Sequence, residues 1–67
     1  MDKDKALAAI VEAALALGAA HGVTLWGIKI AKQHKDEMRI DELSAISEQQ
    51  RRAMLKLAHV EIWIKGL

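Results

Sequence analysis

The sequence predicts an all-α fold in one small domain covering residues 1–67. We expect a three-helix bundle, or a helical hairpin preceded by an N-terminal helix, in an oligomer. The chain has no proline and only four glycines, so little in it interrupts a helix. It also lacks cysteine and therefore disulfides, and a chain this short buries only about 60% of its unfolded surface. Association is the expected source of further stability.

The first helix is predicted to begin at an Asp2 or Asp4 cap and to end near residues 17–20. The turn that follows is expected at 18–22, where Gly18 or Gly22 can adopt the left-handed conformation that ends helices. One face of this helix carries a core-forming stripe at the helical period, made of Leu7, Ile10, Val11, Ala14, Leu17 and Gly18.

The opposite face of the first helix is rich in alanine and has Glu12 as its only charge. A helix that is apolar all round either lies in the centre of a bundle or lies in lipid. Small side chains let another backbone approach closely, so this face is predicted to contact a further helix. The expected contact residues are Ala9, Ala13, Ala16 and Ala20.

Two further helices are predicted from capping residues. Thr24 is a suitable N-cap for a helix over 25–39 or 25–43. Ser47 and Gln50 form the spacing of a capping box, which predicts a third helix over 48–65. Ser44 and Asp41 are earlier candidates for that cap, and Gly66 is the expected C-terminal stop.

Two stretches, 23–30 and 60–64, are also rich in residues that favour strands, which would give an α/β arrangement. Helix is the preferred interpretation. Gly66 directly follows the second stretch, and Glu61 and Lys65 are spaced for an i,i+4 ion pair on a helix.

The last part of the third predicted helix is apolar on nearly every side. A bundle core uses one stripe, so some large apolar residues are expected to face outward and to form a contact. They are Leu55, Ile62 and Trp63. We therefore expect a non-catalytic interaction or regulatory module, most simply a homodimer or else a binder of another protein, located in the cytoplasm.

An alternative is DNA binding, because residues 17–28 resemble a helix-turn-helix, with Gly18 and Gly22 in the turn, Thr24 as cap and Ile28 as a buried aliphatic. Cations follow that could contact phosphates. They are Lys29, Lys32, His34, Lys35 and Arg39. Against this interpretation, Leu25 occupies a position that should meet base edges, and the net charge is only +1.

A second alternative is a membrane role. Residues 6–28 are long enough to cross about 30 Å of hydrocarbon, and lysines follow them. Glu12 would cost about 2.5–3.5 kcal/mol in the membrane centre, which offsets much of the apolar gain. The acidic residues Asp2 and Asp4 argue against a cleaved secretory leader.

No catalytic, metal or cofactor site is predicted, and no small-molecule substrate is indicated. The histidines His21, His34 and His59 are not spaced at i,i+3 or i,i+4, so a metal site would require the fold to bring them together. Ser44 and Ser47 have no histidine or lysine at helical spacing to activate them, and capping explains them better.

Overall fold

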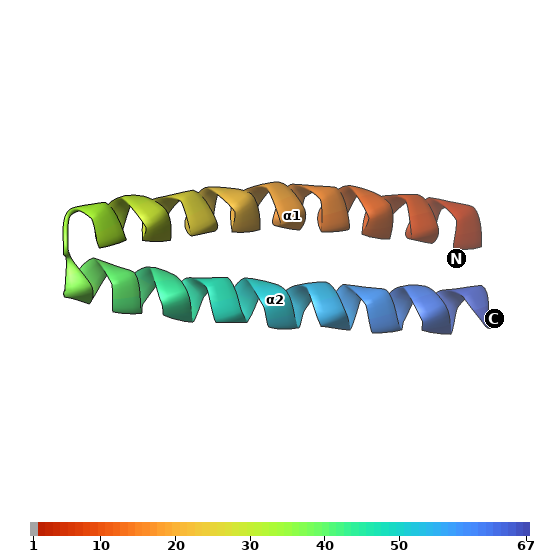
Figure 1. Ribbon diagram of the computed structural model, residues 1–67. Coiled ribbons are helices and arrows are strands. Elements are labelled where there is room, and N and C mark those ends of the chain that lie inside the picture. Colours follow the sequence, from red (N-terminus) through yellow and green to blue (C-terminus); the bar gives the residue numbers. More distant parts are fainter. Residues whose placement is uncertain (1) are drawn as a thin grey trace.

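The chain folds into two long antiparallel helices that lie side by side (Figure 1). The computed structural model describes residues 2–67. Helix α1 spans Lys3–Gln33 and helix α2 spans Glu37–Lys65. The Cα trace of the hairpin is 49 Å long and 14 by 12 Å across, and both termini lie at the end opposite the turn. The all-α prediction is confirmed over these residues, which contain two helices and not the three expected.

The turn predicted at residues 18–22 is wrong, because α1 continues through it without a break. Gly18 and Gly22 both keep negative φ, and a Cβ built on either would meet nothing within 4 Å. Thr24 is not an N-cap. It is buried within α1, and its hydroxyl donates to the carbonyl of Ala20 at 3.1 Å, which satisfies it inside the helix.

The break predicted before residue 48 is also wrong, because Ser47 is buried in the middle of α2. The chain reverses instead at residues 34–36, between His34, which ends α1, and Asp36, which caps α2. Lys35 takes a positive φ of 54°, a conformation that costs a non-glycine residue about 1–2 kcal/mol. This turn therefore lacks the glycine that usually marks such a position.

The start of α1 and the end of α2 lie where the sequence predicts them. The Asp2 carboxylate accepts hydrogen bonds from the backbone N–H groups of Asp4 at 3.0 Å and Lys5 at 3.4 Å, as an N-cap does. Residues 23–30 and 60–64 are helical, so the strand alternative is wrong. Gly66 ends α2 as predicted, with a right-handed φ of −79° in place of a left-handed one.

The two helices meet along a seam whose residues are spaced alternately three and four apart. This is the 3.5-residue period of a coiled coil. The seam consists of Leu7, Ile10, Ala14, Leu17, His21, Thr24, Ile28 and Ala31 in α1, and of Ile40, Leu43, Ser47, Gln50, Met54, Leu57, Glu61 and Ile64 in α2. Every one of these except Ala14 is buried or half-buried, whereas Val11 and Gly18 of the predicted stripe are exposed.

Replacing Gly18 and Gly22 together with alanine should stabilise the hairpin. Alanine favours a helix interior over glycine by about 0.8–1.0 kcal/mol per site, and the structure leaves room for both methyl groups. The melting temperature, followed by circular dichroism, should rise by several degrees. A fall would contradict the continuous α1 and indicate a turn that needs glycine.

Candidate interaction surface

Polar side chains occupy the middle of the seam. His21 Nε2 and Ser47 Oγ are hydrogen-bonded at 2.9 Å across the two helices. Next to them in the seam, the Oε1 atom of Gln50 is buried and has no hydrogen-bond partner among the described residues. Within residues 2–67, the only buried apolar residues are Ala31 and Ile64, which lie toward the two ends of the hairpin. The hairpin therefore has a thin apolar core.

The outer face of α1 carries large apolar side chains in solvent. Leu15 is 70% exposed, Val23 73% and Trp26 66%. By length and composition α1 could also cross a membrane, and α2 buries none of its most apolar stretch. Exposed apolar patches of this kind mark contact sites for proteins or membranes.

The predicted contact residues are all exposed. The four alanines Ala9, Ala13, Ala16 and Ala20 lie on the surface of α1. On α2, Leu55, Ile62 and Trp63 are also exposed. Except for Ala20, which lies just past the middle of α1, both groups lie in the half of the hairpin that holds the termini. At that end, Lys3 Nζ donates to the carbonyl of Lys65 at 3.2 Å.

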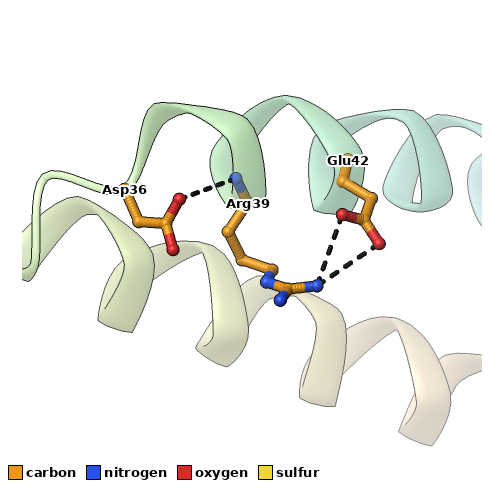
Figure 2. Close-up of polar contacts among 3 residues, drawn as sticks. All are labelled: Asp36, Arg39 and Glu42. Carbon is orange, nitrogen blue, oxygen red and sulfur yellow. Dashed lines mark hydrogen bonds and ion pairs between the residues drawn. The ribbon is translucent and has the colours of Figure 1, made fainter.

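The predicted DNA-contacting cations gather near the turn, but the motif that would position them is absent, because residues 17–28 form part of one helix. Arg39 Nη1 lies 3.3 Å from Glu42 Oε2, and the Arg39 backbone N–H donates to the Asp36 carboxylate at 3.1 Å (Figure 2). Lys29 Nζ lies 5.6 Å from the centre of the Trp26 ring. Two of the five cations therefore already have partners within the chain.

The other ion pairs also lie on α2, with every partner exposed except Glu61, which is half-buried at the seam. Glu48 pairs with Arg51 at 3.5 Å and with Arg52 at 3.4 Å, and Glu61 pairs with Lys65 at 2.8 Å. Exposed pairs at i,i+3 and i,i+4 contribute about 0.3–0.5 kcal/mol each. They stabilise α2 as a helix.

Comparison with protein families, characterised proteins and solved structures finds no match to this chain. Within residues 2–67, no group of three or more histidine, cysteine or acidic side chains is placed to hold a metal ion.

Proposed function

We propose that the protein is a small non-catalytic interaction or regulatory module that self-associates through the exposed apolar faces of its helices, most simply as a dimer. The observation that supports this proposal is the distribution of polarity. Polar groups such as His21 and Ser47 meet inside the hairpin, while large apolar side chains such as Val23 and Val60 face solvent. A folded monomer would leave that surface in water.

The energies involved are large enough for association. Fully burying one large aliphatic or aromatic side chain contributes about 1.5–3 kcal/mol. Association costs an estimated 4–15 kcal/mol in lost freedom. Several such side chains from each of two copies can exceed that cost, whereas isolated exposed residues could not.

Light scattering after size-exclusion chromatography tests the proposal. A dimer should have twice the 7.4 kDa mass of the chain, and dilution should shift it toward monomer. A mass of one chain at every concentration would overturn self-association.

A second candidate is adsorption to a lipid surface, favoured by the length and apolar character of α1 and by the lysines that follow it. Trp26 and Trp63 are the only aromatic residues, so they report on it directly. Lipid vesicles should shift their fluorescence to shorter wavelength if α1 enters the lipid. A shift with vesicles, together with a monomer in plain buffer, would replace the first proposal with this one.

Binding to duplex DNA is measured alongside the tests in plain buffer and with lipid vesicles. An affinity that falls with added salt and with neutral substitutions at Lys29, Lys32 and Lys35 would favour the DNA alternative. With no helix-turn-helix in α1, we expect no such binding.

A further inference from the structure

One edge of the seam is lined by small or apolar residues from both helices. On each helix, these residues directly precede the first seam residue of each seven-residue repeat. In an antiparallel pair of helices, the two rows of such residues lie along the same edge of the seam. We call this edge the alanine groove. Its residues are Ala6, Ala13, Ala20 and Gly27 in α1, and Ile46, Ala53, Val60 and Leu67 in α2.

The opposite edge of the seam has a different character. Its two lines mix charged and polar residues with apolar or small ones. The charged and polar residues are Asp4, Lys32, Glu37, Ser44, Arg51 and Lys65, and the others are Val11, Gly18, Leu25 and Ala58. All residues along that edge are exposed, whereas Ala6, Gly27 and Ala53 of the alanine groove are half-buried. The one charge that continues the groove toward the turn is Arg39, which pairs with Glu42. The hairpin therefore has one apolar edge and one edge that carries most of the charges along the seam.

On α1 the alanine groove continues into a second heptad stripe. The groove residues and their outer neighbours are again spaced three and four apart, as Ala6, Ala9, Ala13, Ala16, Ala20, Val23, Gly27 and Ile30. An apolar seven-residue repeat on one helix is the pattern of a coiled-coil contact, and α2 already covers the other repeat. Small side chains suit this stripe to a helix at the short end of the 8–10 Å packing range.

We infer that two copies of this chain pack face to face through the alanine groove and form a four-helix bundle, an inference that rests on the proposed self-association. The surface is complementary to itself. A two-fold axis parallel to the hairpin places the small groove side chains of α1 against the larger groove side chains of the partner's α2. It also brings the two turns together without net repulsion, because residues 29–42 carry four cations and four carboxylates.

The size of the surface also fits a second copy. The groove face is 49 Å long and two helices wide, or about 20 Å from the diameter of a helix with its side chains. That gives roughly 1,000 Å² per molecule, close to the ~800 Å² per partner of a stable interface. The one charge that continues the groove is Arg39, which pairs with Glu42, so the groove residues themselves offer little to an oppositely charged partner.

Two neighbouring substitutions test the inference in the full chain. Ala20→Glu puts a charge in the alanine groove, and Ala19→Glu puts the same charge on the outer face of α1. Both alanines are exposed in the hairpin, so the monomer should tolerate both. Sedimentation equilibrium should show the dissociation constant raised about 100-fold or more by Ala20→Glu, because its carboxylate would be buried without a partner. Ala19→Glu should leave it nearly unchanged.

The possible outcomes distinguish the assignment of the interface to the alanine groove from the proposal that the chain self-associates at all. If both variants dimerise like the parent, or if only Ala19→Glu dissociates, the groove assignment is overturned and the proposed function stands. If the parent chain is itself a monomer, both fall. Circular dichroism checks that helicity is retained, and Val60→Asp repeats the test from α2 should Ala20→Glu unfold.

Discussion

Replacing Ile64 with alanine is expected to lower the free energy of unfolding by about 2–4 kcal/mol. Ile64 is 4% exposed, the lowest value among the large apolar side chains of the described residues. A single small core rarely supplies more than about 3–5 kcal/mol in total. The variant should therefore keep little of its stability and unfold at a much lower urea concentration than the parent, as followed by far-ultraviolet circular dichroism.

Ile62→Ala is the matched control for this prediction. It removes the same atoms two positions away, from a side chain that is 68% exposed, and should change the free energy of unfolding by no more than about 0.5 kcal/mol. Both variants are compared with the parent at concentrations where the chain is monomeric, because Ile62 is also a predicted contact residue and association adds to apparent stability. Equal losses at the two positions would mean that Ile64 does not anchor the seam.

Replacing Gln50 with leucine is expected to have the opposite effect and to raise the free energy of unfolding by about 1–3 kcal/mol. The Oε1 atom of Gln50 is buried without a partner within residues 2–67, and such a group costs about that much. Leucine also suits a seam position in a coiled coil. Thermal unfolding should show the gain as a higher melting temperature.

Gln33→Leu makes the same change at an exposed position at the end of α1 and should leave the melting temperature nearly unchanged. A loss of stability in Gln50→Leu alone would indicate that the amide makes a hydrogen bond the hairpin needs. The polar middle of the seam would then be a stabilising network and not a weak point.

The sequence predicts the helical class well and the helix boundaries poorly. Asp2 caps α1 as predicted, and the stretches that could have been strands are helical. The errors come from residues typical of turns and caps, namely Gly18, Gly22 and Ser47, which lie inside long helices. Packing along the seam outweighs their local preferences, which amount to about 1 kcal/mol each.

The true turn could not be found from turn composition, because residues 34–36 contain neither glycine nor proline. Its one readable signal is Asp36, whose carboxylate accepts from the Arg39 backbone N–H. A 3.6-residue stripe also misplaced Val11 and Gly18, since the contact follows a 3.5-residue period.

The candidate surface was partly predictable. Each helix has more apolar residues than one core-facing stripe can hold, which predicts that some of them are exposed. The exposed alanines of α1 and the exposed Trp63 agree with this prediction. The α2 side of the alanine groove, with Ile46 and Val60, could not be predicted, because it depends on how the two helices align. That alignment is set by the turn at residues 34–36, which we could not predict from the sequence.

The position of that turn also orders the folding of the chain. Residues that face each other beside the turn are only a few positions apart, whereas Lys3 and Lys65 meet across 62 positions. Closing short loops costs less entropy than closing long ones, so the hairpin is expected to zip from residues 34–36 toward its free ends. Ile64 is the last seam residue of α2 and is buried, so it is expected to pack late in folding. Fraying from the free ends would have to expose this side chain first.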